Sequence, residues 1–108
     1  MDILVKRTGE STLYDVDCTL ELGASETISS VTSVANDPIS GVTDLTITGK
    51  TVNTSTVDYD WGTAAIGKVI QFRVAGGVAG YVYTIRIVYV TNESNIKEAV
   101  VRLNVTDE

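Results

Sequence analysis

Apolar and polar residues alternate most clearly in the last third of this sequence. Between positions 81 and 90 the odd positions form one apolar row, made of Tyr81, Tyr83, Ile85, Ile87 and Tyr89. A second row follows, made of Ala99, Val101, Leu103 and Val105. Successive side chains of a strand point to opposite faces, so both rows predict strands with one buried face. The apolar run from Val69 to Val74 predicts a third strand ahead of them.

Two turn signals separate these strands. The segment from Ala75 to Gly80 is rich in glycine, and the segment from Thr91 to Asn95 is polar. The glycine segment lacks the Lys-Ser/Thr ending of a phosphate-binding loop and precedes a strand, so we expect a hairpin turn there. A helix from Asn95 to Leu103 is an alternative, because apolar residues in that range also fall at helical spacing. The alternation that continues to Val105 favours a strand.

The N-terminal half contains two further predicted strands. From Leu13 to Leu22 apolar and polar residues alternate almost strictly, and Cys18 falls on the apolar face. In the next segment Ile28, Val31 and Val34 are three residues apart, which would also fit a helix. The residues between them are mostly serine and threonine, which are poor helix formers. We therefore expect a strand that carries a bulge.

The middle of the chain is more polar and is broken by turn residues. Asn36-Asp37-Pro38 and Ser40-Gly41 predict turns, because proline fixes φ and glycine permits unusual values of it. A short strand is expected to begin at Leu45 and to end at Gly49-Lys50.

The rest of the middle region predicts one more strand and a loop. Thr51 to Val57 is rich in β-branched residues and is expected to be an edge strand or the partner of one. Asp58 to Ile66 is irregular and is expected to be a loop that contains Trp61. About seven antiparallel strands at intervals of roughly 8 to 12 residues are typical of an all-β sandwich.

Composition and charge limit the classes of partner. The chain has 108 residues, of which 44% are hydrophobic and 20% charged, so we expect one folded domain over residues 1–108. A net charge of −6 repels phosphate backbones and argues against a nucleic-acid partner. The N-terminal segment lacks the features of a signal peptide. No apolar run is long enough to cross a membrane as a helix. Three matches to the glycosylation acceptor pattern, at Asn53, Asn92 and Asn104, are therefore taken as chance.

Candidate catalytic and metal-binding residues are few. The sequence contains no histidine, the side chain that titrates near neutral pH, and this removes most catalytic triads. Cys18 is the only cysteine, which excludes an internal disulfide and a multi-cysteine metal site, and we expect it to be buried. The pairs Asp15/Asp17 and Asp58/Asp60 could supply oxygen ligands to calcium, but their spacing matches no calcium loop. We predict no catalytic, cofactor or metal site.

Two features of the Tyr81 to Val90 strand suggest more specific roles. Tyr83 follows Gly80 by three residues and could form a tyrosine corner, in which the hydroxyl bonds back to the backbone, or could be an ordinary core aromatic. On the opposite face Val82, Val88 and Val90 are candidates for an interface with another protein. Scattered surface valines are the alternative explanation.

Several stretches of the chain together resemble a known family. The opening segment contains Leu13-Tyr14, Asp17, Leu20 to Gly23 and Glu26-Thr27-Ile28. The later segment contains Gly76 to Gly80 followed by Tyr83, the turn near Asn92 to Asn95 and the closing strand to Val105. These stretches cover most of the chain and resemble small tailed-bacteriophage virion proteins with an immunoglobulin-like (Ig-like) fold. The longer polar segment from Ile39 to Trp61, and Phe72 in place of a frequent tryptophan, depart from that family's pattern.

The resemblance implies a non-enzymatic structural protein of a tailed-phage virion. Proteins of this family are proposed to act as fibre-tail adaptors or as capsid accessory proteins. The expected partners are other virion structural proteins, with several copies per virion, no cofactor, no nucleic acid and no membrane. The resemblance also implies that the protein is synthesised in the host cytoplasm and then assembled into the virion. The alternative is a carbohydrate-binding or adhesion module that uses Trp61, Tyr59 and Tyr89 as stacking platforms.

Overall fold

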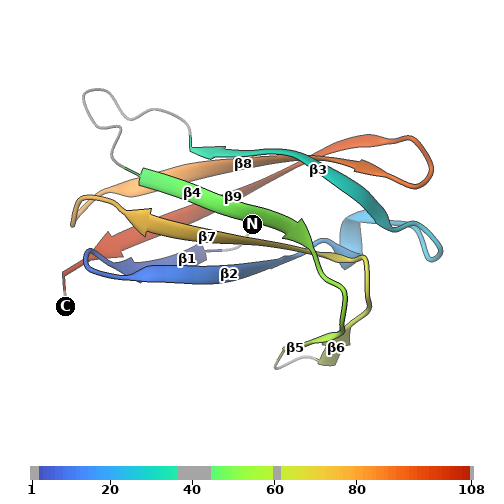
Figure 1. Cartoon of the computed structure of the whole chain (residues 1–108), viewed down its shortest axis with the longest axis horizontal. Coiled ribbons are helices and arrows are strands. Elements are labelled where there is room, and N and C mark those ends of the chain that lie inside the picture. The colour runs from blue at the N-terminus through green and yellow to red at the C-terminus, as the bar shows by residue number, and fades with distance from the viewer. Residues whose placement is uncertain (1–2, 37–44, 60–61, 108) are drawn as a thin grey trace.

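The computed structural model describes residues 3–36, 45–59 and 62–107, which form an all-β structure (Figure 1). Within these ranges the strands are β1 (Ile3–Arg7), β2 (Ser11–Asp17), β3 (Ile28–Asn36), β4 (Leu45–Val52), β5 (Val57–Tyr59), β6 (Gly62–Ala64), β7 (Val69–Gly76), β8 (Val82–Thr91) and β9 (Ile96–Thr106). A short 3-10 turn, η1 (Thr19–Glu21), is the helical element of the described part of the chain.

The strands form two packed sheets and one small hairpin. The first sheet has the order β1-β9-β8-β3 and the second has the order β2-β7-β4. The β5-β6 hairpin projects from one end of this sandwich (Figure 1). Neighbouring strands are antiparallel except for β1 and β9, which are parallel. The expected all-β sandwich is confirmed, but the expectation of about seven antiparallel strands is wrong in the number of strands and in the β1-β9 pairing.

The apolar rows of β8 and β9 form one wall of the core. The β8 residues Tyr83, Ile85, Ile87 and Tyr89 are fully buried, as the alternation predicted. Ala99, Val101, Leu103 and Val105 of β9 lie beside them, and β7 of the other sheet contributes Ile70, Phe72 and Val74. Burying one such side chain contributes roughly 1.5 to 3 kcal/mol, so these rows dominate the stability of the sandwich. Tyr81 precedes β8 and is exposed, so the buried row begins at Tyr83 and the inclusion of Tyr81 in it is wrong.

The 96–106 segment is a strand, and the alternative helix from Asn95 to Leu103 is wrong. Its strand is antiparallel to β8 from Ile96 to Asn104. β3 is likewise a strand with register irregularities, between Ile28 and Ser30 and between Val31 and Ser33, which confirms the expected bulge.

The predicted strand from Leu13 to Leu22 is shorter than expected. β2 ends at Asp17 because the Asp17 carboxylate accepts hydrogen bonds from the Thr19 backbone N–H at 3.0 Å and from the Thr19 hydroxyl at 2.5 Å. These local bonds turn the chain into η1, as short polar side chains often do. Leu20 therefore leaves the apolar face and is fully exposed, whereas Cys18 remains buried as predicted.

The middle region divides into strands differently from the prediction, and the expected strand from Thr51 to Val57 is wrong because residues 53–56 lie between β4 and β5. β4 continues through Gly49 to Val52, with a register irregularity where Gly49 has a φ of 66°, so the expected end at Gly49-Lys50 is a bulge. The expected loop from Asp58 to Ile66 contains the β5-β6 hairpin. The predicted turns near Pro38 and Gly41 lie almost entirely outside the described residues. Trp61 of the predicted loop also lies outside them.

β1 is a strand that the pattern did not predict. Its Lys6 side chain is buried, and the ammonium donates to the backbone carbonyl of Arg7 at 2.6 Å. A buried lysine breaks the apolar alternation that marks a half-buried strand. The Tyr14 hydroxyl donates to the Val5 carbonyl at 2.8 Å and ties β1 to the opposite sheet.

Candidate functional site

The three valines that the sequence proposed as an interface lie on the outer face of β8, but not in one patch. Val82 is 48% exposed, and Val88 and Val90 are partly buried. A rise of about 3.4 Å per residue places Val82 roughly 20 Å from Val88. An ion pair between Arg86 and Glu98, with 2.7 Å between Nη1 and Oε1, crosses the face between them. The outer face therefore has two separate apolar ends.

One apolar end surrounds the β7-β8 turn. Val82 and Val5 flank Asn104 in one row across β8, β9 and β1. Val5 is 62% exposed, and two more exposed apolar side chains belong to the adjoining turn, Val78 and Tyr81. We call these four residues, Val5, Val78, Tyr81 and Val82, the turn-end patch.

The other apolar end lies beside the β8-β9 turn. Val90 is directly opposite Ile96, which is 77% exposed. Val88 is opposite Glu98, so the ion pair limits this end on one side. Of the two ends, this one has fewer exposed apolar side chains.

Tyr83 orders the β7-β8 turn from inside the core. Its ring is fully buried, and its hydroxyl accepts a hydrogen bond from the Val78 backbone N–H at 2.9 Å. This is the contact that a tyrosine corner makes with the backbone a few residues upstream. The same turn needs glycine at Gly77, where φ is 100° and an added Cβ would come within 3.0 Å of the Val105 side chain.

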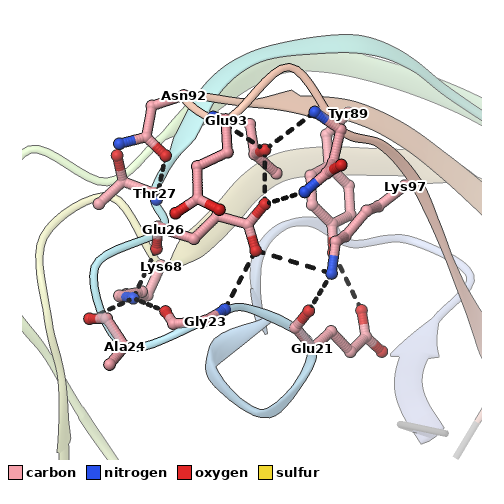
Figure 2. A network of polar contacts seen from close by, with 12 residues as sticks. Glu21, Gly23, Ala24, Glu26, Thr27, Lys68, Tyr89, Asn92, Glu93 and Lys97 are labelled. Carbon is pink, nitrogen blue, oxygen red and sulfur yellow. Dashed lines mark hydrogen bonds and ion pairs between the residues drawn. The ribbon is translucent and has the colours of Figure 1, made fainter.

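A buried carboxylate organises the opposite end of the sandwich (Figure 2). Glu26 is only 3% exposed. Its Oε2 accepts hydrogen bonds from the Thr91 hydroxyl at 2.6 Å and from the Asn95 amide at 2.7 Å. Its Oε1 accepts from the Gly23 backbone N–H at 3.0 Å and lies 3.7 Å from the ammonium of Lys97. The hydrogen bond from Thr91, followed by those from Asn95 and Gly23, lowers the pKa of Glu26 to about 2.

Two lysines hold the same segment through its backbone (Figure 2). The buried Lys68 ammonium donates to the carbonyls of Gly23 at 3.1 Å and Glu26 at 2.5 Å, and lies 3.5 Å from that of Ala24. Lys97 donates to the Glu21 carbonyl. We call this network of Glu21, Gly23, Glu26, Lys68, Thr91, Asn95 and Lys97 the polar junction.

A tyrosine of the core extends the polar junction. The Tyr89 hydroxyl donates to the Glu21 carboxylate at 3.0 Å. Burial raises the pKa of Tyr89, and the nearby Cys18 and Glu21 raise it further. The tyrosine therefore acts as a neutral hydrogen-bond donor at all physiological pH values.

The polar junction has the chemistry of a structural clamp. Glu26 is ionised at neutral pH, and both of its oxygens accept hydrogen bonds from the chain itself. Such an arrangement joins the loop before β3 to the β8-β9 turn and to the start of β7. The pattern of apolar and polar residues did not indicate this role for Glu26 or Lys68. A local signal was present, because a glutamate three residues after Gly23 can reach back to the Gly23 N–H.

Asn53 clamps the base of the β5-β6 hairpin in a similar way. Its side-chain amide donates to the carbonyls of Ser55 at 2.8 Å and Ala65 at 3.0 Å. Its side-chain oxygen accepts from the N–H groups of Gly67 at 2.9 Å and Val69 at 3.0 Å. Asn53 is buried, so its match to the glycosylation pattern describes a structural residue.

The other candidate ligands are dispersed. Asp15 accepts from the Gln71 amide at 2.8 Å, Asp17 holds η1, and Asp58 accepts from the Thr63 hydroxyl at 3.0 Å. Asp60 lies outside the described residues. Across residues 3–36, 45–59 and 62–107, no three acidic or cysteine side chains gather closely enough to hold a metal ion. In the same ranges, no helix is sufficiently long and apolar to cross a membrane.

The three proposed stacking platforms do not form an exposed aromatic surface among the described residues. Tyr89 is fully buried in the core, so the expectation that it offers an exposed ring is wrong. Tyr59 is partly buried on β5, and Trp61 is outside the described part of the chain. When compared with known proteins, the sequence matches no protein-family model and no curated protein.

Proposed function

We propose that the chain is an Ig-like domain that serves as a non-enzymatic structural protein of a tailed-phage virion. The strand order supports the Ig-like assignment. Ig domains place strands B, E and D side by side in one sheet and strands C, F and G in the other. The orders β2-β7-β4 and β3-β8-β9 follow the same scheme, with β1 beside the last strand.

The buried tyrosine of β8 supports the same assignment. An Ig-type tyrosine corner lies near the start of strand F, at the connection from strand E. Tyr83 is the second residue of β8, and its hydroxyl bonds to Val78 in the β7-β8 connection.

The turn-end patch is the observation that carries the binding role. Val5 and Val82 are 62% and 48% exposed and lie in one row of the sheet, next to the exposed side chains of the turn. Apolar side chains that gather on one surface are typical of protein interfaces. The family resemblance supplies the class of partner, another virion protein such as a fibre, tail or capsid component.

Analysis of purified virions tests the proposal. Mass spectrometry should detect the chain in several copies per particle, and cryo-electron microscopy should show the turn-end patch covered by another virion protein. A virion population that lacks the chain would refute the virion role.

A matched pair of variants tests the patch. Val82→Asp should reduce incorporation into virions, because a buried charge at an interface is costly. Leu13→Asp is the control, since Leu13 is 50% exposed, close to the exposure of Val82, and lies on β2 of the other sheet. Equal incorporation of both variants would remove the turn-end patch from the proposal.

The carbohydrate-binding alternative has weaker support, because Tyr89 is buried and Tyr59 is partly buried. We expect no specific binding on a glycan array. Specific binding that is lost in Trp61→Ala would favour the adhesion module over the virion role.

A further inference from the structure

The outer faces of the two sheets differ in composition. Along β2, β7 and β4, the outer face carries mainly threonine, serine, glutamine, arginine and aspartate, and its apolar side chains are Leu13 and Ala75. Along β1, β8 and β9, the outer face carries apolar side chains that are exposed or partly buried, namely Val5, Val82, Val88, Val90, Ile96 and Val100. The first sheet is therefore the better candidate for contact with another protein.

The turn-end patch on this face adjoins an arginine. Val5, Asn104 and Val82 form one row across β1, β9 and β8, and Arg102 lies in the next row, between Ile3 and Thr84. Diagonal neighbours in adjacent strands are roughly 7 to 8 Å apart, a distance that a long side chain can span. The exposed side chain of Arg102 can therefore reach Val5 and Val82.

Arg102 has no carboxylate partner in the described part of the chain. The acidic residue on the outer face of β9 is Glu98, which pairs with Arg86 at 2.7 Å. Glu98 is four residues from Arg102, or roughly 14 Å along the strand. The other ion pair between described residues joins Lys97 to Glu26. A positive charge thus lies beside the apolar patch of a chain whose net charge is −6.

The type of cation at this site narrows the chemistry of a ligand. A guanidinium group is planar and weakly hydrated, and it can donate two parallel hydrogen bonds to one carboxylate. Arginine and tyrosine are enriched in protein interfaces, whereas lysine is depleted. The patch also contains Tyr81, which is 40% exposed. Such a surface suits a partner that offers a carboxylate next to apolar groups.

We propose that the turn-end patch and Arg102 together bind a protein surface on which a carboxylate lies beside apolar side chains. The apolar side chains of the partner would contact Val5 and Val82, and its carboxylate would accept hydrogen bonds from Arg102. This proposal rests on the binding role proposed above and specifies the chemistry of the partner.

Two other occupants fit the charges less well. A two-fold contact between two turn-end patches would bring two Arg102 side chains together, in a pair of chains that each have a net charge of −6. Nucleic acids and anionic membranes also offer anions to an arginine. The net negative charge of the chain repels their phosphate groups, however, so a protein carboxylate is the better match.

Titration of the full chain with short peptides tests the proposed chemistry. We expect a peptide of alternating glutamate and leucine to shift the backbone amide NMR signals of Val82 and Asn104 at physiological salt. A glutamate-serine peptide of equal charge and a lysine-leucine peptide should shift these signals much less. Equal effects of the three peptides, or shifts confined to other strands, would overturn the proposal.

Charge reversal tests the role of the arginine. Arg102→Glu should weaken binding of the glutamate-leucine peptide by roughly fivefold or more and should strengthen binding of the lysine-leucine peptide. Arg73→Glu is the control, because Arg73 is also exposed but lies on β7 of the other sheet. Equal changes in the two variants, or unchanged affinity in Arg102→Glu, would refute the role of Arg102.

Removal of an exposed apolar side chain tests the other half of the site. Val5→Ser should weaken binding of the glutamate-leucine peptide by roughly threefold, because an apolar contact is lost. Leu13→Ser is the control, since Leu13 is 50% exposed on the other sheet. Equal effects of the two variants would show that the turn-end patch does not bind the peptide.

The remaining outcomes distinguish this proposal from its alternatives. Amide shifts at Val82 and Asn104 that depend on protein concentration without peptide would identify a second copy as the occupant and overturn the proposal. Tighter binding of a single-stranded oligothymidine, or of phosphatidylserine vesicles, would also overturn it. Absence of the chain from virions would refute the virion role and leave the peptide result intact. Absence of peptide binding would remove the acidic partner and leave the virion role standing.

Discussion

The polar junction and the turn-end patch have opposite properties. In the junction, the carboxylate of Glu26 and the ammonium of Lys68 are buried and meet partners from distant parts of the chain. In the turn-end patch, Val5 is 62% exposed and Val82 is 48% exposed. The comparison indicates that the conspicuous polar cluster stabilises the fold, whereas the less conspicuous patch is the better candidate for binding.

Removing the buried ammonium should have the largest effect on stability. Lys68→Met removes the ammonium that donates to the Glu26 carbonyl and one of the two donors to the Gly23 carbonyl, which also accepts from the Glu26 backbone N–H. We therefore expect the free energy of unfolding to fall by about 3 kcal/mol. Urea denaturation would measure this loss. Lys50→Met is the control, because Lys50 is exposed and bonds to the Thr32 carbonyl alone in the described contacts, and a change within about 0.5 kcal/mol is expected. Equal losses would contradict a structural role specific to the junction.

The junction should also make stability depend on pH. The pKa of Glu26 in the folded chain, about 2, is below its usual 4.5, so folding favours the ionised form. This stabilisation is complete above pH 4.5 and is lost as the pH falls from there toward about 2. Glu26→Gln should be less stable than the wild type at neutral pH, and the difference between the two should shrink over this acid range.

Urea denaturation of both proteins at several pH values measures that difference. Glu93→Gln is a suitable control, because Glu93 is exposed on the β8-β9 turn. A constant difference between wild type and Glu26→Gln from neutral pH to about pH 2 would show that Glu26 does not provide the acid sensitivity.

The tyrosine hydroxyl beside Glu21 should make a smaller contribution to the junction. Tyr89→Phe removes the bond to the Glu21 carboxylate, and we expect the free energy of unfolding to fall by about 1 kcal/mol. Urea denaturation would measure this loss. Tyr81→Phe, at an exposed tyrosine of the turn-end patch, should change stability little, and equal losses in both variants would argue against a structural role of the Tyr89 hydroxyl.

The smallest effect on stability is expected at an exposed apolar residue close to the junction. Leu20→Ser should change the free energy of unfolding by no more than about 0.5 kcal/mol, because the side chain is fully exposed. Thermal unfolding would measure this change. A large loss of stability would mean that Leu20 is part of the core in solution.

Local patterns predicted the parts of the fold that depend on neighbours in sequence. The apolar rows of β8 and β9 could be predicted from the sequence, because alternate residues of a strand share a face. The bulged β3 was also predicted, from β-branched and hydroxyl residues at irregular spacing. These features need no knowledge of distant partners.

The missed features depend on contacts between distant segments. Glu26 and Thr91 are 65 positions apart in the sequence, and β1 is defined by its pairing with β9. Leu20 was assigned to a buried face because the two hydrogen bonds from Thr19 to Asp17 that end β2 do not alter the alternation. Such contacts carry no periodic signal, so a single sequence did not reveal the junction or the turn at η1.

The parallel pairing of β1 with β9 has a consequence for biosynthesis. Ile3 pairs with Arg102, so β1 leaves the ribosome long before its partner strand exists. A growing chain has exposed β1 backbone until β9 is made, and unpaired strand edges favour association with other chains. Slowing translation of the residues that lead up to β9 should therefore prolong the period in which the nascent chain can aggregate.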